Sequence, residues 1–175
     1  TCTLCMGMMN VGIIGKKLKV VAMAGILSAM VTACRWGNLS YSASASVPQS
    51  WTRMDTVEFM ISDNGFHLTA GRAFQFVVDV RYTGEYAYRD LWLLLRHNVA
   101  DSLKWQTDTL CCPLYSQKGR PLGQGLTGLY TIEIPYTTLV ADGSGQTRMQ
   151  LIHCMANDSL KGISDVGIRV RSLTE

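Results

Sequence analysis

From residue 51 onward, hydrophobic and polar positions alternate with the two-residue period of β-strands. The clearest stretch, residues 73–82, places large apolar side chains on one face: Phe74, Phe76, Val78, Val80 and Tyr82. The opposite face carries Gln75, Asp79 and Arg81. Residues 130–134, 148–154 and 166–170 are also β-like. The almost continuously apolar residues 91–96 predict a strand that is buried on both faces.

Turn signals separate these segments, at residues 63–65, 83–84, 118–121 and 142–145. No stretch after residue 51 carries an apolar stripe of helical period and length, and only residues 157–162 suggest a single helical turn. Seven or eight short strands with frequent turns predict one all-β domain over residues 51–175. We expect an antiparallel β-sandwich, with a jelly-roll strand order as a variant.

The N-terminal part has the layout of a secretory signal. Three lysines precede an apolar run over residues 20–30, and small residues lead directly to Cys34. The sequence Val-Thr-Ala-Cys at 31–34 resembles the bacterial lipobox, in which the cysteine is lipidated and becomes the first mature residue. A transmembrane helix is the weaker alternative, because a span needs about 20 apolar residues. We therefore predict a signal peptide over residues 1–33, with an over-long assigned start, and lipidation at Cys34.

Residues 34–50 are rich in serine and poor in apolar residues, which predicts a flexible tether between the lipid and the domain. All thirteen acidic residues lie after Cys34, whereas three of the sixteen basic ones, Lys16, Lys17 and Lys19, lie before it. The predicted mature chain is therefore formally neutral. It has no Lys/Arg run, which excludes a nucleic-acid-binding footprint.

The six cysteines do not form a disulfide framework in the sequence. Cys2 and Cys5 lie upstream of the signal and Cys34 is the lipid site, which leaves Cys111, Cys112 and Cys154. Neighbours along a strand point to opposite faces, so at most one of the adjacent pair can face Cys154. One disulfide or three free thiols remain open.

No motif predicts catalysis, a cofactor or a metal. Residues 123–128 match G-x-G-x-x-G, but a β-like segment follows where a dinucleotide site needs a helix, so we interpret them as a loop between strands. The three histidines have no metal-ligand spacing: His67, His97 and His153. No spacing selects a catalytic pair among the carboxylates at strand ends, which are Asp79, Asp90, Asp108, Glu133 and Asp165.

Aromatic residues are dense over residues 82–92, at Tyr82, Tyr86, Tyr88 and Trp92. Exposed aromatics on a β-sandwich stack on sugars or anchor protein partners. The alternative is closure of the core, which the pattern favours for Trp92 and leaves open for Tyr86 and Tyr88.

Three stretches carry a specific resemblance: Tyr-Ala-Tyr-Arg-Asp-Leu-Trp-Leu at 86–93, Lys-Gly-Arg-Pro-Leu-Gly-Gln-Gly at 118–125, and residues 160–170. With Trp51 and residues 55–59 they resemble, in order, the GldH family of gliding-motility-associated lipoproteins of Bacteroidetes. The resemblance implies a periplasm-facing lipoprotein that supports gliding, with a link to the type IX secretion machinery. It implies no catalytic residues.

We therefore expect a non-enzymatic envelope lipoprotein that acts through protein contacts. Its expected partner surface comprises Tyr86, Tyr88, Arg89, Trp92, Lys118 and Arg120. The alternative is a carbohydrate- or peptidoglycan-binding module that uses the same aromatics. Arg35 follows the lipid cysteine where aspartate would retain a lipoprotein at the inner membrane, so we expect the outer membrane.

A short pattern also suggests modification. Asp-Ser/Thr-aliphatic triplets resemble the O-glycosylation site of periplasmic proteins in Bacteroidetes, and they occur at residues 55–57, 101–103, 108–110 and 158–160. Ser102 and Ser159 lie in loop-like segments, so we expect them to be the acceptors.

Overall fold

A computed structural model describes residues 39–61, 66–143 and 145–173. The predicted signal peptide and Cys34 lie outside these residues. Within the described part of the chain, no helix is long and apolar enough to cross a membrane.

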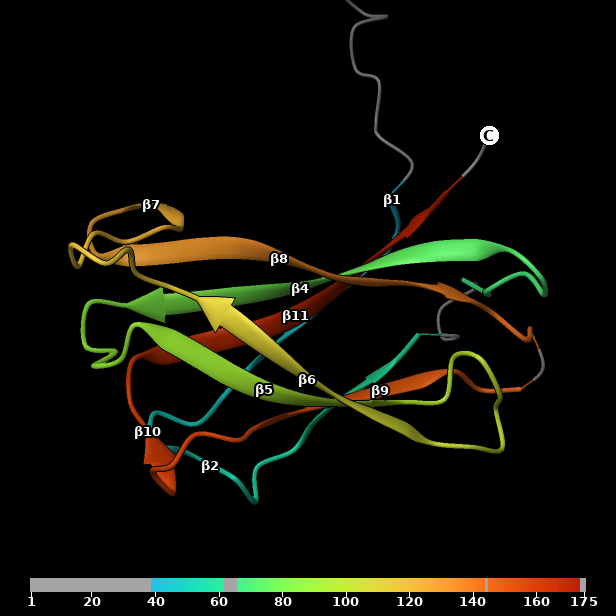
Figure 1. Ribbon diagram of the computed structural model, residues 1–175, viewed down its shortest axis with the longest axis horizontal. Coiled ribbons are helices and arrows are strands. Elements are labelled where there is room, and N and C mark those ends of the chain that lie inside the picture. The colour runs from blue at the N-terminus through green and yellow to red at the C-terminus, as the bar shows by residue number, and fades with distance from the viewer. Residues whose placement is uncertain (1–38, 62–65, 144, 174–175) are drawn as a thin grey trace, which may run out of the picture. The chain divides into compact units, whose positions relative to one another are not determined.

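Two antiparallel sheets form the domain (Figure 1). The first contains, in spatial order, β1 (Leu39–Ser46), β11 (Ile163–Ser172), β4 (Ala73–Thr83), β8 (Leu129–Val140) and β7 (Gln124–Leu126). The second contains β3 (Val57–Met60), β9 (Arg148–His153), β5 (Asp90–His97) and β6 (Gln106–Pro113). A short ribbon pairs β2 (Trp51–Thr52) with β10 (Ser159–Leu160). The predicted all-β antiparallel sandwich is confirmed.

The strand order is that of a jelly roll. In each sheet, late strands insert between early ones: β11 lies between β1 and β4, and β9 lies between β3 and β5. Successive strands β3, β4 and β5 also alternate between the two sheets. This interleaving of two Greek keys brings segments that are distant in sequence to the same end of the sandwich.

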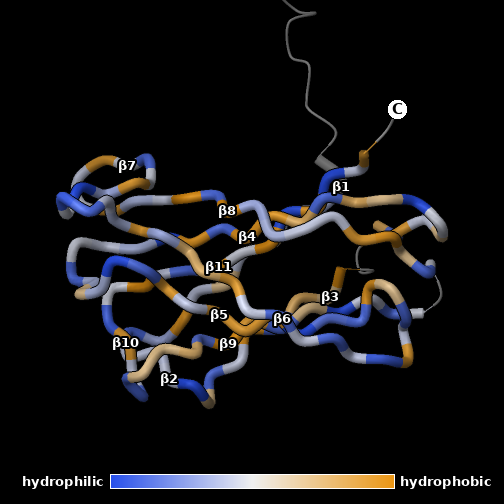
Figure 2. Tube along the Cα trace, in the orientation of Figure 1, coloured by the Kyte–Doolittle hydropathy of each residue, from blue (hydrophilic) through white to orange (hydrophobic). Residues whose placement is uncertain are grey.

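The core lies between the sheets and is built by strand alternation. All five predicted inward residues of β4 are buried: Phe74, Phe76, Val78, Val80 and Tyr82. They meet Leu91, Leu93 and Leu95 of β5 and Met149 and Leu151 of β9 within one hydrophobic cluster. Figure 2 shows the accompanying change between hydrophobic and hydrophilic positions along the strands.

Strand β5 is buried on one face only, which corrects the expectation of a strand buried on both faces. Leu91, Leu93 and Leu95 point inward, whereas Trp92 is 45% exposed and Arg96 is also exposed. No further layer of the described chain covers the outer face of the second sheet, so an apolar run here leaves Trp92 at the surface.

The predicted tether is also corrected, because residues 39–46 form strand β1. The strand pairs with β11 from Leu39 to Ser46. Its side chains alternate in burial but are only weakly apolar. Tyr41, Ala43 and Ala45 are half-buried, and the serines between them are exposed. Trp51 was expected to begin the fold, whereas the domain already includes residues 39–50.

The glycine-rich residues 123–128, expected as a loop between strands, are a loop only in part, because residues 124–126 form strand β7. Thr127 and Gly128 both have positive φ, of 57° and 84°, and join β7 to β8 in a tight hairpin. Consecutive positive φ angles are those of a type I′ turn, for which glycine is favoured. Residues 157–162 form a turn and strand β10 instead of the suggested helical turn.

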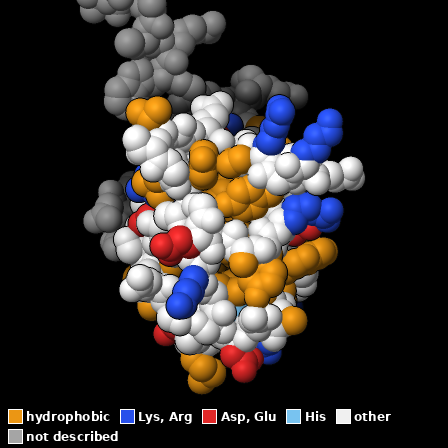
Figure 3. All heavy atoms as spheres, turned by 90° about the vertical axis from the view of Figure 1, so that its left-hand side faces the viewer, with side chains coloured by type: hydrophobic (Ala, Val, Ile, Leu, Met, Phe, Trp, Pro, Cys, Tyr) orange, Lys and Arg blue, Asp and Glu red, His pale blue; other side chains and the backbone are white. Residues whose placement is uncertain are grey.

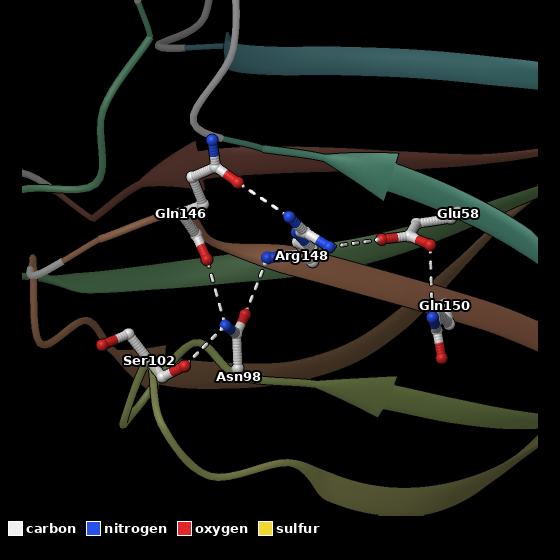
Figure 4. A network of polar contacts seen from close by, with 6 residues as sticks. All are labelled: Glu58, Asn98, Ser102, Gln146, Arg148 and Gln150. Atoms are coloured by element: carbon white, nitrogen blue, oxygen red, sulfur yellow. Dashed lines mark hydrogen bonds and ion pairs between the residues drawn. The ribbon is translucent and has the colours of Figure 1, made fainter.

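A buried asparagine fastens the loop after β5 at the other end of the sandwich (Figure 4). Asn98 donates to the carbonyl oxygens of Ser102 and Gln146, each at 3.0 Å, and accepts from the backbone N–H of Arg148 at 2.7 Å. Arg148 also lies 3.6 Å from Glu58, which itself accepts from Gln150. Ser102 therefore lies in a loop with a fixed path.

Candidate functional site

A tyrosine-lined hollow of about 420 Å³ lies at the end of the sandwich where β4 turns into β5. Its walls are the β4–β5 connection and residues 115–121, and Tyr130 of β8 contributes to its lining. Figure 3 faces this end, where hydrophobic side chains gather near the middle and lysine and arginine side chains stand along one side. Its lining includes Tyr86, Tyr88, Arg89, Tyr115, Gln117 and Tyr130.

The hollow rests on Tyr82, which is fully buried. Its hydroxyl donates to the carbonyl oxygen of Leu114 at 2.6 Å and accepts from the backbone N–H of Gly123 at 3.0 Å. Its ring contacts those of Tyr115 and Tyr130, with centroids 5.4 and 5.6 Å away. Tyr82 thus joins the first sheet to the segment that follows β6.

Two lining tyrosines are fixed through their hydroxyls. Tyr86 is 3% exposed and donates to the carbonyl oxygen of Asp90 at 3.0 Å. Burial raises the pKa of Tyr86, so its hydroxyl stays neutral. Tyr115 donates to the carbonyl oxygen of Thr83 at 3.1 Å. Their rings are consequently rigid parts of the wall.

The other two lining tyrosines have free hydroxyls. Tyr88 and Tyr130 are half-buried, and no group among the described residues hydrogen-bonds to either hydroxyl. The ring of Tyr88 meets that of Tyr86 edge-on, at 67° and 5.6 Å. These two hydroxyls are therefore available to a ligand.

Arg89 links the two walls of the hollow. Its Nε and Nη2 donate to Asp90 at 2.9 and 2.6 Å, and its carbonyl oxygen accepts from the N–H groups of both Leu114 and Tyr115. Hydrogen bonding to Asp90, and then its charge, raise the pKa of Arg89. The guanidinium stays charged and 58% exposed at the rim.

The structure separates the six residues expected to form a partner surface. Tyr86, Tyr88 and Arg89 line the hollow, although Tyr86 belongs mainly to the core. Lys118 and Arg120 are exposed on the loop that carries Gln117 and Gly119 of the wall. Trp92 lies on the outer face of the second sheet and does not line the hollow.

Tyr115 and Tyr130 were missed by sequence reasoning. Each stands apart from the dense aromatic stretch of residues 82–92, and only the strand order brings them beside Tyr82. The three stretches that resemble the family also meet here. Gly162 follows β10, and a Cβ placed on it would lie 2.2 Å from the backbone nitrogen of Tyr86.

The carboxylates considered as catalytic candidates do not line the hollow. Asp79 and Glu133 are opposite each other on β4 and β8, and Arg169 of β11 donates to both, at 2.6 and 2.5 Å. Asp108 accepts from Tyr136, which also hydrogen-bonds to buried His97 at 3.1 Å. Asp79, Glu133 and Asp108 are therefore hydrogen-bonded to neighbouring side chains. The described residues contain no cluster of three side chains that could hold a metal ion.

The three cysteines of the described part are free thiols. Cys112 faces the core, and burial raises its pKa to about 12, so it remains protonated. Cys111 lies opposite Trp92 on the neighbouring strand and is half-buried, as is Cys154. Of the two alternatives left open by the sequence, the structure has the free thiols.

The chain is also similar to solved structures at low identity. Eiger TNF from S. frugiperda is 14% identical over 79% of this chain and 89% of that chain, with a TM-score of 0.33. The infectious bursal disease virus VP2 subviral particle is 8% identical over 77% of this chain and 39% of that chain, with a TM-score of 0.20. Scores this low support no functional inference.

No curated protein matches the chain significantly. The model of the GldH lipoprotein family, by contrast, matches residues 40–170, which include both sheets except the first residue of β1 and the last two of β11, together with the β2–β10 ribbon and every wall of the hollow. The chain therefore belongs to the GldH lipoprotein family, the gliding-motility-associated lipoproteins.

Proposed function

We propose that this lipoprotein supports the gliding and type IX secretion machinery by holding an envelope protein at the tyrosine-lined end of its sandwich. The observation that carries the proposal is the convergence of the family-like stretches on one built surface. Gly162 packs on Tyr86, the carbonyl oxygen of Arg89 holds the wall at Leu114, and Tyr82 fixes Gly123. Aromatic and arginine side chains at such a surface are the usual anchors of protein interfaces.

The anchor belongs to the same proposal. Cys34 carries the acyl chains, the signal peptide before it is removed, and the domain faces the periplasm from the outer membrane. β1 begins at Leu39, so only residues 35–38 separate the lipid from the first strand. The five Cα-to-Cα steps from Cys34 to Leu39 span at most about 18 Å, which keeps the sandwich close to the membrane surface.

A carbohydrate- or peptidoglycan-binding module is the second candidate. The observation in its favour is the hollow itself, since about 420 Å³ lined by four tyrosines suits a small ligand. Among the described residues, however, no aspartate, glutamate or asparagine lines this hollow. The protein-contact function therefore has the stronger support.

Affinity purification from native membranes, followed by mass spectrometry, tests the proposal. Wild-type protein should retain gliding or secretion components, and Cys34→Ala should lose membrane attachment. A double variant, Tyr88→Ala with Arg89→Ala, should lose the partners while staying in the membrane. Trp105→Ala is the matched control, because Trp105 is a 40% exposed aromatic in the β5–β6 connection at the other end of the sandwich. Retention of the same partners by the double variant would overturn the proposed surface.

A further inference from the structure

We propose that the tyrosine-lined hollow binds a proline-containing, polyproline-II segment of the partner, flanked by acidic residues. This inference rests on the proposed function and specifies the chemistry of the partner. It depends on three features of the hollow: which hydrogen-bonding groups line it, how its rings are oriented, and which charges surround it.

The free polar groups of the hollow include several hydrogen-bond donors. Besides the hydroxyls of Tyr88 and Tyr130, its side chains offer the guanidinium of Arg89 and the amide of Gln117. The guanidinium only donates, whereas the hydroxyls and the amide both donate and accept. A polyproline-II strand has no internal hydrogen bonds and few N–H groups, so it presents carbonyl oxygens that need donors.

The exposed rings of the hollow do not form one flat platform. Tyr88 meets Tyr86 edge-on at 67°, and Tyr115 and Tyr130 are inclined to buried Tyr82 by 73° and 36°. The rings of Tyr115 and Tyr130 are therefore not parallel. A hollow lined by such rings accepts a proline ring or a branched aliphatic side chain, as in aromatic-lined grooves that bind proline-rich peptides.

Both sides of the proposed complex are ordered before they meet. Tyr86 and Tyr115 are held by hydrogen bonds to backbone carbonyls, and Tyr130 packs on buried Tyr82. Polyproline II is likewise extended without its partner. Little conformational entropy is therefore lost on binding, which favours measurable affinity from a small contact.

The charge around the hollow selects acidic flanks. Arg89, Lys118 and Arg120 are exposed around it, against one exposed acid, Glu85. Asp90 pairs with Arg89 and therefore neutralises only one of these three cations. Acidic residues beside the proline core would gain attraction that weakens with added salt.

Fluorescence anisotropy with the full-length lipidated protein in detergent tests this inference. The probe is a labelled peptide with a Pro-Pro-Leu-Pro-Pro core and two glutamates at each end. We expect saturable binding, at least tenfold weaker for a Gly/Ser core and severalfold weaker when the glutamates are replaced by lysines. Peptidoglycan fragments should not compete.

Variants separate binding from folding. Tyr88→Phe and Tyr130→Phe keep the rings and remove only free hydroxyls, so each should weaken binding severalfold with an unchanged melting temperature. The charge reversal K118E with R120E should reverse the preference for acidic flanks, and Trp105→Ala should bind like wild type. Equal affinity for the proline and Gly/Ser cores, or displacement by peptidoglycan fragments, would overturn the inference. If membrane partners are retained and depend on Tyr88 while no proline peptide binds, the proposed function stands and this inference fails.

Discussion

The hydroxyl of Tyr82 donates to the carbonyl oxygen of Leu114 over 2.6 Å, and both residues are fully buried. Tyr82 ends the inward row of β4 in the first sheet, and Leu114 follows β6 of the second. The Tyr82 side chain therefore ties the first sheet to the segment that follows β6, beneath the hollow. The hydroxyl oxygen of Tyr82 also accepts from the backbone N–H of Gly123, which ties the segment before β7 to Tyr82.

Tyr82→Phe should destabilise the domain by about 1–2 kcal/mol. It leaves the N–H of Gly123 without its partner and removes one of the two hydrogen bonds to the Leu114 carbonyl, which still accepts from Leu122. Urea unfolding followed by circular dichroism measures this loss. Tyr130→Phe is the control, because the hydroxyl of Tyr130 has no partner among the described residues, and its stability should stay within about 0.5 kcal/mol of wild type. Equal losses in the two variants would contradict the role of the Tyr82 hydroxyl.

Gly162→Ala should destabilise the domain by roughly 3 kcal/mol or more, because two costs combine. The residue has a φ of +81°, and an added Cβ would lie 2.2 Å from the Tyr86 nitrogen. Gly71 has a similar φ of +72° but nothing within 4 Å of an added Cβ. Gly71→Ala therefore measures the backbone cost alone, about 1 kcal/mol. A loss for Gly162→Ala that matches that of Gly71→Ala would show that the β4–β5 connection moves aside easily.

Much of the fold follows from the local alternation of apolar and polar residues. The rest depends on hydrogen bonds between strands that are distant in sequence. The alternation of residues 74–82 is strong because every second side chain is large and apolar, and all of them are buried. Strand β1 carries only Tyr41, Ala43 and Ala45 on its inner side, so its hydropathy resembles that of a linker. Its hydrogen bonds with β11, which lies more than a hundred residues away, define it as a strand.

The sequence predicted part of the candidate site, and the rest depends on the strand order. Tyr86, Tyr88 and Arg89 are dense in sequence, and the loop of Lys118 and Arg120 meets them in space. Trp92 shares their segment but points to the outer face of β5, because the strand period turns it away from the hollow. Tyr115 and Tyr130 depend on the jelly-roll order, which a single sequence suggests only as a variant.

Mild acid should weaken the fold. His97 and His153 are buried, and burial lowers the pKa of each below the ordinary value of 6.5. The native state therefore binds fewer protons than the unfolded state below about pH 6.5, so the free energy of unfolding falls as the pH decreases. The slope is at most about 1.4 kcal/mol per pH unit for each histidine.

Urea titrations between pH 7 and pH 5 measure this slope. His153→Phe keeps a ring against Trp51, whose centroid is 5.1 Å away, and should flatten the dependence. A slope that His153→Phe does not alter would place the proton uptake elsewhere.

Arg169→Leu should destabilise the first sheet by about 2 kcal/mol, because it leaves Asp79 and Glu133 facing each other on neighbouring strands without their shared cation. Burial already raises the pKa of Asp79, and loss of Arg169 raises it further. The ionised form of Asp79 causes the added cost, and protonation removes it. The loss of stability in Arg169→Leu should therefore shrink as the pH falls toward 4. Adding Asp79→Asn should recover part of the loss at pH 7, and purely additive effects in that double-mutant cycle would contradict coupling.

Protein from its native host should carry a glycan on Ser159 and not on Ser102. Ser159 is exposed on the β2–β10 ribbon, and the preceding Asp158 is 96% exposed. Ser102 is half-buried, its backbone N–H donates to Asp142 at 2.7 Å, and it lies beside Gly145 in the loop that Asn98 fastens. A glycan there would have to displace these contacts, whereas one on Ser159 extends into solvent and need only replace the hydrogen bond to Ser50.

Intact-mass analysis should therefore show an increment that Ser159→Ala removes and Ser102→Ala keeps. An unmodified wild-type mass would refute glycosylation altogether, and loss of the increment in Ser102→Ala alone would reverse the assignment.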